Sequence, residues 1–169
     1  MSTTRIGLEI GSTWVFASAV DWPGWCRRGR GEDAAIATLL EYAGRYGRVA
    51  GRGFQVGRSE VIGRVGGNAT TDFGAPGARG PWDDEPLHAA EVSRQVGLLQ
   101  SSWAAFDQAD AAAPAVLPKG PRGGGRDRDG IAGTLLEGNV GTTWPPRYFI
   151  RRAAWHVLDH AWELEDKSR

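Results

Sequence analysis

The chain has 169 residues, of which 41% are hydrophobic, so it can bury a core as one compact domain or as two small domains packed together. Its 20 basic and 20 acidic residues cancel, which removes the overall field that draws many proteins onto nucleic acids or anionic membranes. A single cysteine excludes an internal disulfide framework. The start of the chain has neither the apolar run of a signal peptide nor a membrane-spanning helix, so we expect a cytoplasmic protein.

Three short strands are predicted near the start of the chain. Apolar and polar residues alternate over 5–10, which is the period of a half-buried strand. Residues 14–20 are apolar on both sides and predict a central strand that is covered on both faces. A Pro-Gly turn at 23–24 then precedes a short extended piece over 25–28, so the first two strands form a hairpin and the third adds to it.

A helix and a fourth strand are predicted next. Apolar side chains recur at helical spacing from Asp33 to Gly47, which indicates one amphipathic helix laid on the sheet. Residues 54–65 have the character of a last strand that is interrupted by glycines. Residues 66–84 are rich in glycine, proline and small polar residues and have no periodicity, so we interpret them as a linker or a draped loop.

The second half of the chain is predicted to be helical. A stripe of one histidine and five apolar residues steps by four and three over five turns: His88, Val92, Val96, Leu99, Trp103 and Phe106. A flexible loop is expected over 119–129, and a short helix weakened by glycines over 129–137. Pro145-Pro146 then opens a terminal helix with histidines on one face and tryptophans on the other, so we expect both faces to be buried.

Two histidines of the terminal helix are the candidate site. His156 and His160 are four residues apart, so their imidazoles lie on one side of the helix and can place ring nitrogens on a single ion. A metal site generally takes a third protein ligand. Asp159 and Glu163 are better placed to hold a histidine ring, and His88 could reach the pair if the helices run antiparallel. The alternative is that the pair forms hydrogen bonds within a helix interface.

Residues 16–46 resemble the HicB-like fold, in which a strand, an acidic and Pro-Gly turn, a short strand and a helix follow one another. The matching positions are Asp21, Pro23, Gly24, Gly29, Glu32 and Ala35. The resemblance implies an antiparallel sheet with a helix. In that family the module is chiefly an interaction and dimerisation unit, so a homodimer is an expected form of this chain.

Residues 121–129 and 147–168 resemble the actinobacterial branch of the DinB-like superfamily. That superfamily consists of four-helix bundles, and its relatives include transferases and isomerases that use the thiols mycothiol or bacillithiol. Its metal triad takes one histidine from the second helix and a His-x-x-x-His pair from the last, which His156 and His160 match. The second-helix histidine would fall at or near Thr134, so the resemblance implies a degenerate site. The short spacing before the last helix implies a bundle of about three helices.

These patterns predict an α+β protein with a HicB-like unit over 1–65, a linker over 66–84 and a reduced DinB-like helical bundle over 85–169. The resemblance implies a divalent-metal-binding, thiol-dependent protein of the transferase or hydrolase type with a small-molecule or thiol substrate. The candidate ligands of zinc, nickel or iron are His156, His160 and His88. The alternative is a non-catalytic interaction or dimerisation module of the HicB-like type.

Two weaker candidates are the arginines of the second half and the lone cysteine. Contacts to nucleic acid would rest on Arg122, Arg126, Arg128, Arg147, Arg151 and Arg152. Acidic residues are interleaved with the arginines of the loop, so we expect these side chains to be solvated and nucleic acid to be an unlikely partner. Cys26 lies in a predicted strand with no histidine or helix start beside it in sequence, so we interpret it as a core residue.

Overall fold

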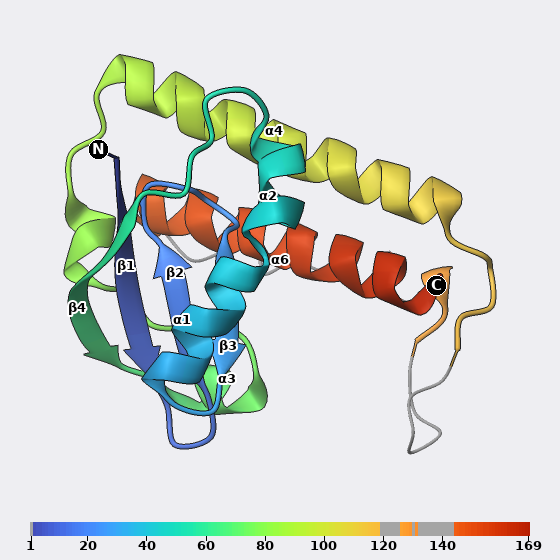
Figure 1. The fold of residues 1–169 in the computed structure, drawn as a ribbon, viewed down its shortest axis with the longest axis horizontal. Helices are drawn as coiled ribbons and strands as arrows, with labels where there is room; N and C mark the ends of the chain where they lie inside the picture. The colour runs from blue at the N-terminus through green and yellow to red at the C-terminus, as the bar shows by residue number, and fades with distance from the viewer. Residues whose placement is uncertain (1, 119–125, 130, 132–143) are drawn as a thin grey trace.

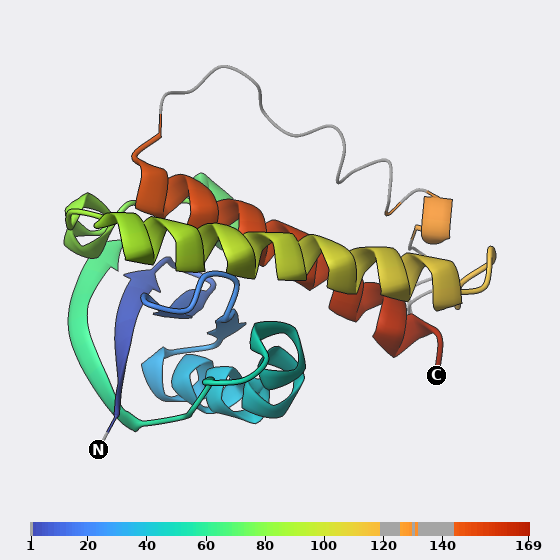
Figure 2. The same cartoon turned by 90° about the horizontal axis from the view of Figure 1, so that it is seen from above.

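The computed structural model describes residues 2–118, 126–129, 131 and 144–169 of the chain. In these residues a four-stranded sheet and five α-helices form an α+β fold, as predicted. Two short helices lie on one side of the sheet, and the C-terminal helix lies on the other side with a second long helix beside it (Figures 1 and 2). No helix in the described residues is long and apolar enough to cross a membrane.

The three strands predicted near the start of the chain are confirmed as β1 (Thr3–Ile10), β2 (Val15–Ala19) and β3 (Cys26–Gly29). They pair antiparallel, with Ile6 opposite Ala19 and Val15 opposite Gly29. All five residues of β2 are buried, because β2 is an inner strand with cover on both faces.

The fourth strand, β4 (Arg58–Gly66), corrects the expectation of an antiparallel sheet. It pairs with β1 in parallel, so the strand order is β3-β2-β1-β4 and the sheet is mixed. The connection explains the direction. Two helices, α1 (Glu32–Glu41) and α2 (Ala43–Ala50), join β3 to β4, and a helical crossover returns the chain in the direction in which it left the sheet.

The single helix predicted from 33 to 47 is thus two helices that meet at Tyr42. The second of them is held by Tyr46, whose ring stacks on Trp25 with 5.7 Å between the centroids. Its hydroxyl donates a hydrogen bond of 2.8 Å to the carbonyl of Pro23.

One hydrophobic core joins the sheet to both sets of helices. Its buried residues from the sheet unit are Ile6, Leu8, Val15, Ala17, Ala19, Trp25, Ala35, Leu39 and Tyr46. Leu158 and Trp162 of the C-terminal helix belong to the same cluster. The sheet unit and the last helix therefore share a core, and the position of that helix is fixed by apolar burial against the sheet unit.

The segment predicted as a linker or draped loop contains two short helices, α3 (Ala69–Phe73) and η1 (Pro81–Asp84). It covers the face of the sheet opposite α1. The Trp82 ring lies on Gly7, where an added Cβ would be 2.5 Å from a ring carbon. The buried carboxylate of Glu9 accepts hydrogen bonds from the Thr71 hydroxyl and from the Gly77 N–H.

The two long helices, α4 (Ala89–Ala112) and α6 (Pro146–Lys167), lie side by side and run in the same direction (Figures 1 and 2). Glu91 at the start of α4 pairs with Arg147 at the start of α6, at 2.8 Å. Near the other end of α4, a buried cluster combines Phe106, Ala109, Ala113 and Leu117 with Val157, Ala161 and Leu164. The contacts at both ends of α4 therefore show that α4 and α6 run parallel.

The stripe predicted for α4 is wrong for four of its six members, the first of which, His88, is exposed. Val92, Val96 and Trp103 are 39%, 38% and 38% exposed, whereas Phe106 is buried. The face against α6 also contains Gln95 and Ser102. These polar side chains can be buried because each makes a hydrogen bond four residues back on its own helix, Gln95 to the Glu91 carboxylate and Ser102 to the Leu98 carbonyl.

Candidate functional site

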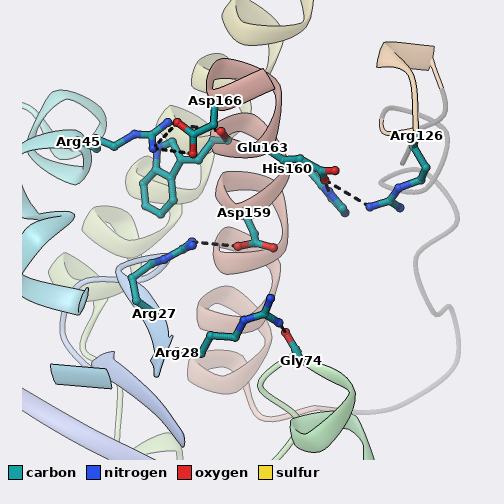
Figure 3. A network of polar contacts seen from close by, with 10 residues as sticks. Arg27, Arg28, Arg45, Gly74, Arg126, Asp159, His160, Glu163 and Asp166 are labelled. Carbon is teal, nitrogen blue, oxygen red and sulfur yellow. Dashed lines mark hydrogen bonds and ion pairs between the residues drawn. The ribbon is translucent and has the colours of Figure 1, made fainter. Parts of the chain in front are cut away.

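An open cleft of about 630 Å³ lies between α6 and the edge of the sheet. One wall is the side of α6 from Arg152 to Asp166. The opposite wall includes Arg27 and Arg28 from the edge strand β3, and residues 73–75 at the end of α3 and just after it. Figure 3 shows that Arg27 of β3 reaches Asp159 of α6, whereas Arg28 reaches the Gly74 carbonyl.

The two candidate histidines line this cleft together. Arg152, His156, His160 and Glu163 follow one another at spacings of four, four and three residues, so they lie along one side of α6. The imidazole rings of His156 and His160 are 4.7 Å apart between centroids, with their planes at 77°. The structure therefore brings together the pair that the sequence predicts, and it places the pair beside an open space.

Glu163 holds the ring of His160. Its Oε2 atom lies 3.3 Å from Nδ1 of His160, and its Oε1 atom accepts a hydrogen bond of 2.7 Å from Lys167. The hydrogen bond from His160, with the nearby charges of Lys167 and Arg126, lowers the pKa of Glu163 to about 2. An ionised carboxylate at Nδ1 favours the tautomer with the proton on Nδ1, so Nε2 of His160 keeps its lone pair.

His88 is not brought to the pair. It is the exposed residue before the first turn of α4. Arg147, at the start of α6, donates hydrogen bonds to the carbonyls of Glu85 and Pro86 just before His88. Because the two helices are parallel, the nine residues from Arg147 to His156 separate His88 from the pair by roughly 14 Å along the axis, at about 1.5 Å per residue.

The described residues contain no group of three or more histidine, cysteine, aspartate or glutamate side chains placed to hold a metal ion. Position 134, where the DinB-like resemblance expects a histidine and the chain has Thr134, lies outside the described residues. Within the described part the donor set is the two imidazoles, with Glu163 turned toward Nδ1 of His160. Two neutral imidazoles suit zinc, nickel, copper or iron, so the pair fits part of such a site.

Arginines also line the cleft, and the two from β3 were not among the predicted site residues. Arg27 makes an ion pair of 2.9 Å with Asp159 and stacks on the ring of Tyr42 at 4.1 Å. Arg45, beside the cleft, pairs with Glu165 and Asp166. These two guanidinium groups are therefore neutralised by carboxylates of α6, and Figure 3 shows both ion pairs.

Arg28 and Arg152 differ, because in the described part of the chain neither has a carboxylate partner. Arg28 donates a hydrogen bond of 2.8 Å to the Gly74 carbonyl and lies 4.6 Å over the ring of Trp14. Arg152 lies 4.6 Å over the ring of Trp155. Burial lowers the pKa of Arg152, whereas its neighbour Arg151 has a raised pKa because Asp83 outweighs the same effect of burial.

Gly74 is needed where Arg28 crosses the cleft. Its φ of 115° favours glycine, and an added Cβ would be 2.1 Å from the Arg28 guanidinium. We expect Gly74→Ala to lower the free energy of unfolding by about 1–3 kcal/mol, measured by urea unfolding. Gly44→Ala is the matched control. A Cβ added at Gly44 would have nothing in the described chain within 4 Å, so Gly44→Ala should raise the free energy of unfolding by about 0.5–1 kcal/mol. Equal effects of both substitutions would contradict the role of Gly74.

Cys26 is a buried core residue, as predicted. Burial raises the pKa of its thiol to about 11, so it remains protonated and unreactive at neutral pH. It packs with Phe16 and Trp155 on the face of the sheet opposite α1.

No family model matches the chain, and neither the curated proteins nor the solved structures contain a match. The fold and the site define an α+β protein with an open, arginine-lined cleft at a histidine pair.

Proposed function

We propose that this protein binds a small molecule in the cleft between β3 and α6, and that His156 and His160 hold a divalent metal ion at the wall of that cleft. The observation that carries the proposal is that both imidazoles line one open cleft of about 630 Å³. A pair with a purely structural role would be expected in a filled helix interface. The open space therefore supports a binding role over the alternative of a non-catalytic interaction module.

The arrangement of the pair supports a metal. A ring separation of 4.7 Å is short enough for both imidazoles to reach one ion, because zinc–nitrogen bonds are about 2.0–2.1 Å long. The Glu163 carboxylate behind His160 is the partner that metal-bound histidines usually have. When bound, such an ion would act as a Lewis acid toward a thiol or water, which is the chemistry implied by the DinB-like resemblance.

The experiment is the metal content of chain purified without a histidine tag. We expect close to stoichiometric zinc, nickel or iron in the wild type and loss of that metal in His156→Ala and in His160→Ala. His88→Ala is the matched control and should keep the metal, because His88 is exposed and lies at the far end of the helix pair. Equally low metal in the wild type and in both variants of the pair would overturn the metal proposal.

A further inference from the structure

We infer that the ligand of this cleft is an anion, a small molecule with a carboxylate or phosphate group that is bound by Arg28 of β3 and Arg152 of α6. The inference rests on the proposed function for the position of the binding site. It adds the chemical class of the ligand, and it does not require that a metal is bound.

The charges that line the cleft favour an anion. Four arginines line it, Arg27, Arg28, Arg126 and Arg152, against three acidic residues, Asp159, Glu163 and Asp166. Each acidic side chain already has a cationic partner: Asp159 has Arg27, Glu163 has Arg126 and Lys167, and Asp166 has Arg45. Positive charge without a counter-charge in the described residues is therefore left at Arg28 and Arg152. A cleft lined with an excess of one charge concentrates ligands of the opposite charge.

Both guanidinium groups are held in place before any ligand binds. Arg28 is fixed by the face of Trp14 and by its hydrogen bond to the Gly74 carbonyl. Arg152 is fixed by the face of Trp155. A guanidinium that lies over an aromatic ring keeps the N–H groups at its edge available, and these groups match the two oxygens of a carboxylate or phosphate. Little conformational entropy is then lost on binding.

The environment of Arg152 gives the strongest physical reason. This side chain is partly buried and makes no ion pair with a carboxylate in the described chain, and the more distant Glu9 offsets only part of the loss of hydration. Removing a cation from water without a counter-charge is unfavourable, and an anion in the cleft would compensate for it. Arg151, one residue earlier, has such a counter-charge in Asp83. Of these two neighbours, the one without a carboxylate partner is the one that faces the cleft.

The test measures binding of inorganic phosphate and of acetate to the whole chain, after metal removal with EDTA, by titration calorimetry. We expect the wild type to bind at least one of the two anions. Charge-assisted hydrogen bonds are strong, so Arg152→Gln and Arg28→Gln should each weaken binding about tenfold or more. Arg152→Lys keeps the charge but loses the planar group, and should fall between the wild type and Arg152→Gln.

Arg30→Gln is the matched control. Arg30 stacks on the same Trp14 ring as Arg28, at 4.9 Å, but it does not line the cleft. We expect the anion affinity of Arg30→Gln to stay close to that of the wild type. Arg28 is exposed, and neither target arginine has a carboxylate partner in the described residues, so the variants should remain folded, which circular dichroism checks. No binding of either anion to the wild type, or equal affinity of the wild type, Arg28→Gln and Arg152→Gln, would overturn the inference.

The two proposals fail in different ways. Low metal content together with anion binding that depends on Arg28 and Arg152 would overturn the metal proposal and support the anion inference. Bound metal that depends on His156, with anion binding that is insensitive to both arginine substitutions, would support the metal proposal and overturn the anion inference. Anion binding that appears only after zinc is added and is lost in His156→Ala would also overturn it, because the metal would then be the binding group.

Discussion

Asp83→Ala should lower the free energy of unfolding by about 3–5 kcal/mol, the cost of leaving a buried cation without its partner. Asp83 and Arg151 form two hydrogen bonds of 2.9 and 2.8 Å, and their side chains are 1% and 6% exposed. This pair fastens α6 to the segment that covers the sheet. Urea unfolding at neutral pH, followed by far-ultraviolet circular dichroism, measures the effect.

Asp84 provides a control in the same short helix. It pairs with Arg79, and both side chains are about half exposed, at 51% and 52%. Exposed ion pairs contribute about 0–1 kcal/mol, so Asp84→Ala should have an effect in that range. A loss of similar size in Asp83→Ala and Asp84→Ala would contradict the importance of burial.

A double variant tests whether the loss of stability in Asp83→Ala comes from the unpaired charge of Arg151. Replacing a buried ion pair with apolar residues of similar volume is often close to neutral, because the cost of burying both charges disappears as well. Asp83→Ala combined with Arg151→Met should therefore be more stable than Asp83→Ala alone. A double variant no more stable than the single variant would show that a buried, unpaired Arg151 is not the source of the loss.

The strands could be predicted from sequence because their signal is local. Alternation over 5–10 and the apolar run over 14–20 reflect which faces of each strand are covered, and the structure confirms both strands. The direction of β4 could not be predicted in this way. It depends on how the α1–α2 crossover returns the chain, and side-chain periodicity does not record that path.

The face of α4 was predicted incorrectly for a physical reason. Hydropathy places Val92, Val96 and Trp103 inside, but the helix instead buries Gln95 and Ser102 against α6. A hydrogen bond within the helix removes much of the cost of burying a polar side chain. Such compensation depends on the rotamers of neighbouring residues, which a periodicity argument does not include.

The histidine pair of the site could be predicted, whereas the arginines could not. His156 and His160 lie on one helix, so their spacing of four fixes their relative position. Arg28 and Arg152 are 124 positions apart in sequence and meet at the cleft only because α6 packs beside the edge strand β3. The one local signal is an arginine near tryptophan, as in Arg152 and Trp155, and that pattern also occurs at surfaces without a site.

Glu163 should make the stability of the metal-free chain depend on pH below about 4.5. The pKa of this carboxyl falls from its ordinary value of 4.5 to about 2 in the folded chain, because His160 and Lys167 stabilise the ionised form. A depressed pKa contributes stability that is present above about 4.5 and is lost as the pH falls toward about 2. Its side chain is 28% exposed, so after allowing for solvent screening we expect about 1–2 kcal/mol.

The measurement is the free energy of unfolding in EDTA at pH 6 and pH 3, for the wild type, Glu163→Gln and His160→Asn. Other carboxyl groups also titrate in this interval, so the informative quantity is the difference between the chains. At pH 3 a little over half of this contribution is lost, so the wild type should lose about 1 kcal/mol more than Glu163→Gln, and His160→Asn should fall between them because it removes the largest cause of the depressed pKa.

The Glu163→Gln variant also tests the metal proposal. Replacing a residue that orients a metal-bound histidine usually weakens metal affinity by about 10–100-fold, so Glu163→Gln should weaken zinc binding by that factor. A changed pH dependence with unchanged zinc affinity would mean that Glu163 stabilises α6 without orienting His160 toward an ion.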